Sequence, residues 1–255
     1  MKGSFKKALE RGDLLIGATI VELGRPSVIK VLNDAGFDFI FLEYEHASLS
    51  SETVADIITT GRDVDLPTIV KLPALERHFV TKILDAGAMG IQLPRTNSKE
   101  EIAKLVQWSK FPPIGDRAAC PGLGNTDYQL TVELRDFLVQ ANERTIVAAH
   151  IETKAGLENL DDILSNEHLD VAFVGPYDLS IDLGVPGQWT DPGLVREVQR
   201  VIDKARARKI APGIAIWDLE ISKMWIERGM QLIEFESALG LIYAGSVALL
   251  RELGR

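Results

Sequence analysis

Short apolar runs alternate with amphipathic runs along nearly the whole chain, and this alternation limits the folds open to it. Near-continuous apolar strands are typical of parallel sheets that are buried on both faces. We expect strands over residues 14–20, 37–45, 66–72, 89–94, 144–153, 169–176, 210–216 and 230–236. We expect helices over residues 25–36, 50–62, 74–87, 98–110, 133–143, 155–165, 191–209, 218–229 and 239–253. Strict alternation favours a closed (β/α)8 TIM barrel over an open doubly wound sheet.

The length of the chain agrees with this fold. It has 255 residues, and α/β barrels of about 250 residues form one unit. No polar linker divides the sequence, so we expect a single domain over residues 1–255. The glycines form no GxGxxG motif after the first predicted strand, which leaves a dinucleotide-binding fold without support.

Charge and composition exclude several classes of partner. The net charge is −9 and no long basic run occurs, so nucleic acid is a poor partner. No stretch approaches the roughly 18 apolar residues of a membrane span. The first residues, MKGSFKKALERGDLL, are too polar for a secretory signal, and the lone Cys120 cannot form an internal disulfide. We therefore expect a cytoplasmic protein.

Two carboxylates stand where adjacent predicted strands end. The active site of a (β/α)8 barrel lies at the carboxyl ends of its strands. Glu152 closes the fifth predicted strand and Asp178 follows the sixth. Hard oxygen ligands at this place suit Mg²⁺ or Mn²⁺, with water and substrate completing the coordination. The alternative is that each carboxylate caps the helix that follows it.

A histidine and a lysine end two other predicted strands. His46 is a candidate base, because an imidazole titrates near neutral pH, or else a loop histidine bonded to a carboxylate. Lys71 ends an apolar strand, where a charge is costly unless it is paired or used. It can stabilise an enolate, orient a carboxylate or form a Schiff base, and the alternative is a lysine that reaches solvent.

Several stretches in a fixed order give the chain a specific signature. They are AGFDF to EH (35–46), LDAGAMGIQLP (84–94), FPPIGDR (111–117), HIETKAGLENLDDIL (150–164), VGPYDLSIDLG (174–184) and APGIA (211–215). In these stretches the chain resembles the HpcH/HpaI aldolase family, the class II pyruvate aldolases related to the citrate lyase β subunit. The resemblance implies a (β/α)8 barrel of the phosphoenolpyruvate/pyruvate-binding type. It also implies a homo-oligomer, a hexamer or trimer of dimers, whose last helix is swapped between subunits.

The resemblance further implies a reaction. It is the reversible cleavage of a 4-hydroxy-2-oxo acid to pyruvate and an aldehyde, with Mg²⁺, or else Mn²⁺ or Co²⁺, as cofactor. The small-molecule partners are thus a 2-keto acid and an aldehyde. By motif, Glu152 and Asp178 are the implied metal ligands. His46 is the implied base, and Asp85 in LDAG is the group that raises its basicity.

Substrate-binding groups are implied in the same way. The backbone of Gly175, Pro176, Tyr177 and Asp178 is expected to cradle the substrate carboxylate. Arg117 matches the arginine of the PP.G.R motif and is expected to organise the loop or the pocket rather than to act in catalysis.

The chain departs from the family pattern at several of these positions. Lys71 stands where the family has arginine, so it keeps the charge and loses the planar fork. His150 stands where glutamine is common, and it is expected to contact substrate, act as a second acid or base, or bind the metal. Residues 43–46 read Glu-Tyr-Glu-His where D.EH is common. Glu234 and Glu236 are expected either to pair with Lys71 or to lie lower in the barrel.

Two alternatives to a class II aldolase remain. In a class I aldolase, Lys71 would form a Schiff base with the keto acid. In a non-catalytic barrel, Glu152 and Asp178 would hold a metal that binds a keto acid without turnover. Since the fold alone does not separate these functions, the choice depends on the site.

Overall fold

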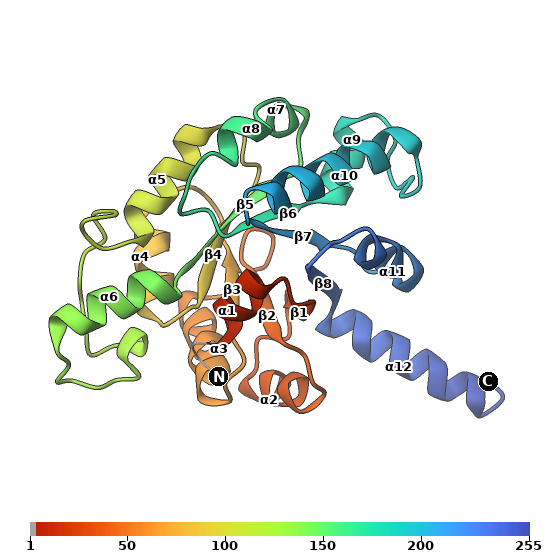
Figure 1. Cartoon of the computed structure of the whole chain (residues 1–255). Helices are drawn as coiled ribbons and strands as arrows, with labels where there is room; N and C mark the ends of the chain where they lie inside the picture. Colours follow the sequence, from red (N-terminus) through yellow and green to blue (C-terminus); the bar gives the residue numbers. More distant parts are fainter. Residues whose placement is uncertain (1–3) are drawn as a thin grey trace.

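Eight parallel strands close into a barrel in chain order in the computed structural model, which describes residues 4–255 (Figure 1). The strands are β1 Leu15–Ile20, β2 Phe39–Glu43, β3 Thr68–Lys71, β4 Gly90–Leu93, β5 Ile146–Ile151, β6 Val171–Val174, β7 Ala211–Ala215 and β8 Leu232–Ser237. β8 pairs with β1 and completes the ring. The predicted (β/α)8 barrel is therefore confirmed. A single domain over residues 1–255 stays a prediction, and residues 1–3 lie outside the described residues.

Helices follow the strands and surround the barrel. They are α1 Ser4–Arg11, α2 Pro26–Asp34, α3 Ser51–Asp63, α4 Arg77–Asp85, α5 Lys99–Ser109, α6 Leu134–Arg144, α7 Lys154–Glu158, α8 Leu160–Ile163, α9 Pro176–Asp182, α10 Pro192–Ala207, α11 Leu219–Glu227 and α12 Ala238–Glu252, with a 3₁₀ turn, η1, at Gly124–Thr126. The sequence did not predict α1 and α9, and the expected helix over 155–165 is split into α7 and α8 at Asn159. Short helices of this kind carry too few turns to show a helical period.

Alternate residues of each strand face two separate apolar layers. In β2, Ile40 and Leu42 pack outward among the helices, whereas Phe39 and Phe41 point into the barrel. Inside the barrel, the Phe41 ring stacks on that of Phe173 at 5.6 Å between centroids. Each fully buried side chain of this size contributes about 1.5–3 kcal/mol. The period of two thus builds a core on both faces of the sheet.

Helix α1 closes the amino-terminal end of the barrel. Its buried Phe5, Ala8 and Leu9 belong to the inner apolar layer, and it lies in front of the strands in Figure 1. The helix was not predicted, although Phe5, Ala8 and Leu9 have the i, i+3, i+4 spacing of one helix face. Since this end is covered, the open end of the barrel is the carboxyl end of the strands.

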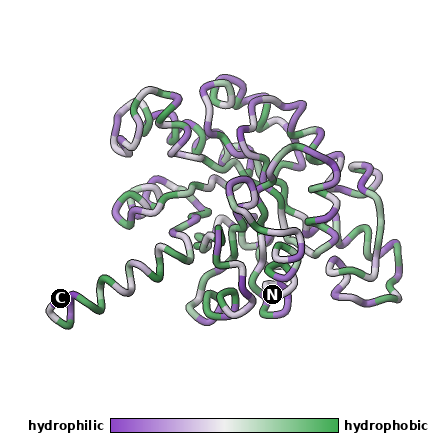
Figure 2. Tube along the Cα trace, turned by 180° about the vertical axis from the view of Figure 1, so that it is seen from behind, coloured by the Kyte–Doolittle hydropathy of each residue, from purple (hydrophilic) through white to green (hydrophobic). Residues whose placement is uncertain are grey.

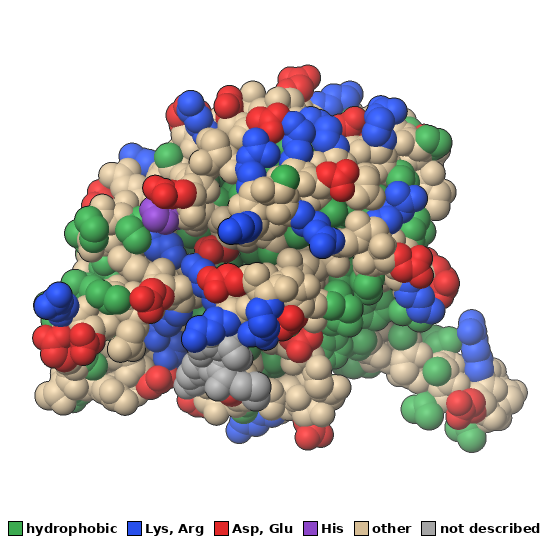
Figure 3. Space-filling model, viewed as in Figure 1, with side chains coloured by type: hydrophobic (Ala, Val, Ile, Leu, Met, Phe, Trp, Pro, Cys, Tyr) green, Lys and Arg blue, Asp and Glu red, His purple; other side chains and the backbone are tan. Residues whose placement is uncertain are grey.

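The last helix, α12, extends away from the barrel (Figures 1 and 2). Its exposed apolar side chains are Leu239, Ile242, Tyr243, Leu249 and Leu250. Hydrophobic side chains also gather on the barrel surface beside the start of α12 (Figure 3). An apolar helix with so little cover in one chain agrees with the implied swap between subunits, which stays a prediction. Within residues 4–255, no helix combines the length and the apolar character needed to cross a membrane.

Candidate active site

A layer of polar side chains occupies the barrel interior at the carboxyl end of the strands. Apolar residues fill the same strand faces lower down, as Phe41 does below Glu43 and Ile69 does below Lys71. The layer is made up of Thr19, Glu43, Lys71, Gln92, His150 and Glu234. A polar layer above an apolar core is the expected place for chemistry in this fold. Sequence reasoning found four of these residues and missed Thr19 and Gln92.

Lys71 is held between two carboxylates. Its Nζ lies 2.8 Å from Glu45 Oε2 and 3.2 Å from Glu43 Oε2, and the lysine is only 6% exposed. Burial by itself lowers the pKa of Lys71, but the charges of Glu43, Glu45 and Glu152 outweigh it and raise the pKa above its ordinary value. A Schiff-base lysine must lose its proton to attack a carbonyl. The protonated, paired Lys71 therefore disfavours the class I alternative.

The turn after β2 brings His46 to the rim of the barrel. Glu43 Oε1 accepts hydrogen bonds from the backbone N–H groups of Glu45 at 2.7 Å and His46 at 3.1 Å, which fixes the turn. The imidazole is 67% exposed, and its Nε2 lies 3.5 Å from Glu45 Oε2. Within the described part of one chain, the carboxylate beside His46 is thus Glu45.

The two proposed metal ligands are linked by a single arginine. Glu152, which is buried, accepts a hydrogen bond at Oε1 from the backbone N–H of Arg95 at 2.6 Å. Asp178 is in the first turn of α9, and its Oδ1 lies 3.5 Å from Nη1 of Arg95. Burial raises the pKa of Glu152 to about 7, and the charge of Asp178 acts in the same direction. The negative charges of the two carboxylates repel each other, which favours a cation between them.

The donor set suits a hard ion that keeps water ligands. No group of three or more His, Cys, Asp or Glu side chains in residues 4–255 is arranged to hold a metal. Mg²⁺ binds through one or two carboxylates and retains several waters. The Glu152 and Asp178 pair therefore fits Mg²⁺ or a similar divalent ion.

His150 lies directly beside Glu152, one of the two proposed metal ligands. Its Nδ1 is 3.5 Å from Glu152 Oε2, and among the described residues neither ring nitrogen has a hydrogen-bond partner. Burial lowers the pKa of His150 well below its ordinary value, and the charges of Lys71 and His46 add to the effect. Its ring is therefore neutral and offers one donor and one acceptor. The amide of Gln92, also buried, has both polar atoms without a partner in the described chain.

Gly175 is required by the packing of the site. A Cβ atom at this position would lie 2.5 Å from His150 Nε2 and 2.6 Å from Glu152 Oε2, closer than real Cβ contacts. The glycine leads into Pro176, the first residue of α9, where a missing N–H costs nothing. The Gly-Pro pair thus makes room for two site residues and starts the helix that carries Asp178.

Asp85 and Arg117 lie at the opposite end of the barrel. α4 descends from the end of β3 to the start of β4, so Asp85 at its carboxyl end is near the amino-terminal rim. Its Oδ1 accepts hydrogen bonds from Arg117 Nη2 at 2.8 Å and from Asn125 Nδ2 at 3.1 Å. These contacts order the loop after α5. Within one chain, the structure does not bring Asp85 to His46 or Arg117 to the mouth of the barrel.

Aromatic side chains flank the mouth next to Asp178. The Tyr177 ring is 4.8 Å from that of Trp189 and 5.7 Å from that of Trp217, measured between centroids. Burial raises the pKa of Tyr177, and the charges of Glu236 and Asp218 act in the same direction. The phenol therefore stays neutral next to Asp178, one of the two proposed metal ligands.

The two glutamates of β8 have different surroundings. Glu234 is buried, and its Oε1 accepts a hydrogen bond from the Thr19 hydroxyl at 2.6 Å. Burial raises the pKa of Glu234 to about 8, and the charge of Glu43 contributes. Glu236 instead accepts a hydrogen bond from the backbone N–H of Ser237 at 2.8 Å, at the start of α12. The hydrogen-bond partner of Glu234 is thus Thr19, whereas Lys71 acts on it only through its charge.

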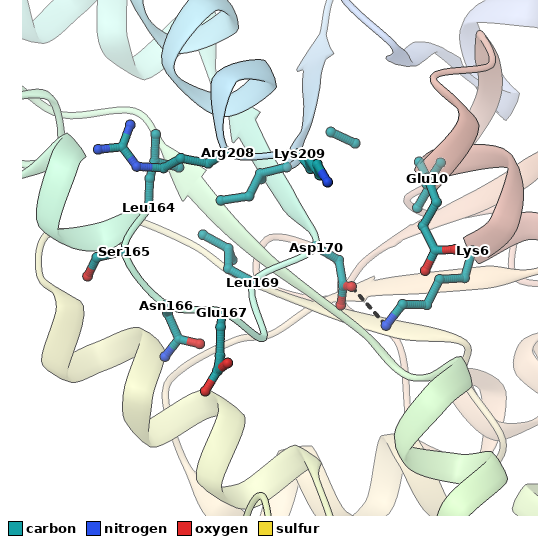
Figure 4. A pocket seen from close by; sticks show the side chains of 13 residues that line it. Lys6, Glu10, Leu164, Ser165, Asn166, Glu167, Leu169, Asp170, Arg208 and Lys209 are labelled. Atoms are coloured by element: carbon teal, nitrogen blue, oxygen red, sulfur yellow. Dashed lines mark ion pairs between the residues drawn. The ribbon is translucent and has the colours of Figure 1, made fainter.

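A separate cavity of about 530 Å³ lies at the amino-terminal end of the barrel (Figure 4). Lys6 of α1 and Asp170, just before β6, form an ion pair in it at 2.8 Å, and Lys209 lines its edge. This cavity contains none of the site residues predicted from the sequence. The candidate active site is therefore the polar layer at the other end.

Comparisons with known proteins agree with this arrangement. A model of the HpcH/HpaI aldolase/citrate lyase family matches residues 20–241. The chain is 30% identical over 215 residues to a hydroxypyruvate/pyruvate aldolase of Roseovarius nubinhibens, with 84% of the chain and 82% of that protein covered. It is 28% identical over 254 residues to a 4-hydroxy-2-oxo-heptane-1,7-dioate aldolase of Salmonella dublin, with 100% of the chain and 95% of that protein covered.

A solved structure gives the same result. The HpcH/HpaI aldolase from Desulfitobacterium hafniense superposes with a TM-score of 0.90 at 26% identity and covers 97% of this chain and 96% of its own. The relatives named as aldolases support a lyase activity. As its motifs predicted, the chain belongs to the HpcH/HpaI aldolase/citrate lyase family.

Proposed function

We propose that the protein is a class II aldolase that reversibly cleaves a 4-hydroxy-2-oxo acid to pyruvate and an aldehyde. One observation carries the proposal: Glu152 contacts the backbone of Arg95, Asp178 contacts its guanidinium, and the charge of the buried Lys71 acts on Glu152. The arrangement joins a divalent-ion site to a fixed positive charge. That combination suits chemistry in which negative charge develops on a keto acid.

Glu152 and Asp178 would hold the ion, with Mg²⁺ first and Mn²⁺ or Co²⁺ as alternatives. When bound, the ion supplies positive charge that polarises the keto group of the substrate. Lys71 adds a second, permanent charge, because Glu43 and Glu45 keep it protonated inside the barrel. Its orientation is set before substrate arrives, so little reorganisation is needed during the reaction.

The proton of the substrate's 4-hydroxyl group is assigned to His46. In cleavage the imidazole takes this proton while the bond between C3 and C4 breaks, and the electron pair of that bond passes to the keto acid. In synthesis the same proton returns. Glu45 Oε2, 3.5 Å from Nε2, can orient the ring, whereas the resemblance implied Asp85 as the carboxylate that acts on His46.

Neutral groups complete the proposed pocket. His150 and Gln92 face it with unpaired donors and acceptors, which suits hydrogen bonds to substrate oxygens. Because Pro176 has no N–H, the carboxylate cradle expected over Gly175–Asp178 depends on the backbone N–H groups of Tyr177 and Asp178.

Exchange of pyruvate methyl protons in D₂O tests the proposal without any aldehyde. We expect Mg²⁺-loaded protein to catalyse exchange, EDTA to stop it, and Glu152→Gln to reduce it by at least about 100-fold. Asp182→Asn is the matched control, since Asp182 lies in the same helix as Asp178 and accepts a hydrogen bond from the backbone N–H of Lys154. Exchange that continues with EDTA would exclude the metal mechanism. Binding of Mg²⁺ and pyruvate without exchange would favour the non-catalytic barrel instead.

We also propose that the protein assembles into a homo-oligomer, a hexamer or trimer of dimers. The support is α12, whose apolar side chains find little cover in one chain. Asp85 is distant from His46 of its own chain, so any action on an imidazole would have to be on that of a neighbouring subunit. Light scattering on purified protein tests the assembly.

A further inference from the structure

Three cationic side chains can be compared as partners for a substrate carboxylate, and two of them are already engaged by carboxylates of the chain. Lys71 is buried and held by Glu43 and Glu45. Arg117 is buried at the other end of the barrel and bonded to Asp85. The side chain of Arg95, by contrast, is 60% exposed and lies at the mouth. Of these three, Arg95 alone has a guanidinium within reach of an incoming ligand.

The backbone of Arg95 is fixed beside the metal pair. Its N–H donates to Glu152 Oε1, and its φ of +46° is unusual for a residue with a side chain. The backbone N–H of the next residue, Thr96, donates to the His150 carbonyl at 3.0 Å. The side-chain hydroxyl of Thr96 accepts a hydrogen bond from the backbone N–H of His150 at 3.2 Å. Strained backbone that its surroundings enforce is a feature of functional sites. The turn after β4 is thus fastened to β5 on the residues next to Glu152.

The side chain of Arg95 is held much less firmly than its backbone. A contact of 3.5 Å joins its Nη1 to Oδ1 of Asp178, and both side chains are more than half exposed. Exposed ion pairs of this kind are weak. A divalent ion attracts Asp178 more strongly than this contact does, and it also repels the guanidinium.

We infer that Arg95 binds the substrate carboxylate with its side chain, in addition to the backbone cradle expected over Gly175–Asp178. Its guanidinium leaves Asp178 when the ion takes that carboxylate, and then binds the carboxylate of the 2-keto acid. The backbone anchor keeps the guanidinium beside the ion after it is released. A guanidinium fork pairs with a carboxylate through two hydrogen bonds, which the lysine on β3 cannot provide. This inference rests on the proposed function.

Calorimetry on Arg95→Asn separates the inference from a purely structural role. Asparagine tolerates a positive φ and keeps the backbone N–H to Glu152, so the metal pair stays built. We expect the variant to bind Mg²⁺ as tightly as the wild type or more tightly, because a competing cation is gone. We expect its Mg²⁺-loaded form to bind pyruvate about 10- to 100-fold more weakly, as for loss of a charged hydrogen bond. The pyruvate affinity of Arg95→Lys should lie between those of the wild type and Arg95→Asn.

Two controls make the test specific. Methyl pyruvate lacks the carboxylate charge, so its affinity should be the same for wild type and Arg95→Asn. Arg196→Asn changes an exposed arginine of α10, far along the chain from the site, and should leave pyruvate affinity unchanged.

The results that overturn the inference differ from those that overturn the proposed function. Pyruvate affinity within twofold of the wild type in Arg95→Asn, or a parallel loss of Mg²⁺ affinity, would show that Arg95 does not bind the substrate carboxylate. Failure of the wild type to bind Mg²⁺ or to exchange pyruvate protons would instead remove the proposed function itself.

Discussion

The stability of the fold should depend on the protonation of Glu234. Burial raises its pKa to about 8 from a reference value of 4.5, so between these values the folded chain carries one proton that the unfolded chain has lost. A folded state that binds the extra proton loses stability as the pH rises, by about 1.4 kcal/mol per unit while the difference is a full proton. From pH 6 to pH 8 the loss is roughly 2 kcal/mol, because titration is half complete at the upper end.

Urea unfolding at the two pH values measures this loss. Glu234→Gln keeps the size of the side chain and can still bond the Thr19 hydroxyl, but it carries no titrating group. The free energy of unfolding of the wild type should fall by about 2 kcal/mol more than that of the variant. Other groups titrate in both proteins and cancel in the comparison.

A surface substitution provides the control. Glu220 of α11 is 79% exposed and pairs with Lys223, so Glu220→Gln should follow the wild type at both pH values. If Glu234→Gln also follows the wild type, the carboxyl is already ionised in the folded protein, and the assignment of a neutral Glu234 is wrong.

Three other substitutions test the site and the assembly. Gly175→Ala places a Cβ 2.5 Å from His150 Nε2, so we expect a loss of about 1–3 kcal/mol in stability and at least tenfold weaker Mg²⁺ binding by calorimetry. Lys71→Met leaves the carboxylates of Glu43 and Glu45 unpaired, so the free energy of unfolding in urea should fall by about 3–5 kcal/mol. An unchanged free energy of unfolding would mean that these ion pairs are not buried in solution. Leu249→Asp on α12 should lower the mass found by light scattering, and an unchanged mass would exclude this helix face from the interface.

The barrel could be predicted because its signal is local. Seven of the eight predicted strands contain the observed ones and extend beyond them: the run over 144–153 contains β5 at Ile146–Ile151, and the run over 169–176 contains β6 at Val171–Val174. The eighth, predicted over 230–236, ends one residue before β8 does, at Ser237. Apolar residues continue into the turns, so hydropathy alone overestimates strand length. Helix α9 was missed because its seven residues are too few to show a helical period.

The site could be predicted only where a residue stands at a strand end. Lys71 and Glu152 were found in this way. Arg95 was missed, although it follows the fourth strand directly, because its role comes from a backbone N–H and an unusual φ rather than from residue type. The contact of Thr19 with Glu234 depends on the closure of β1 on β8, which links residues far apart in the sequence.

Asp85 shows what a motif can leave out. The motif assigned it to His46, but helices of this fold run opposite to the strands, so the end of α4 must lie away from the mouth. That direction follows from the fold once the barrel is predicted. A pairing of Asp85 with an imidazole at the mouth of a barrel would therefore have to join two chains.

Glu45 links a buried residue of the barrel interior to an exposed residue at the rim. One oxygen, Oε2, lies 2.8 Å from the ammonium of Lys71 and 3.5 Å from the ring of His46. The same carboxylate oxygen therefore contacts both the exposed ring and the enclosed lysine. Removing this carboxylate changes the base and the buried cation at once. The kinetics of a Glu45 variant would therefore report on the two groups jointly, and only a double-mutant cycle with each partner would separate them.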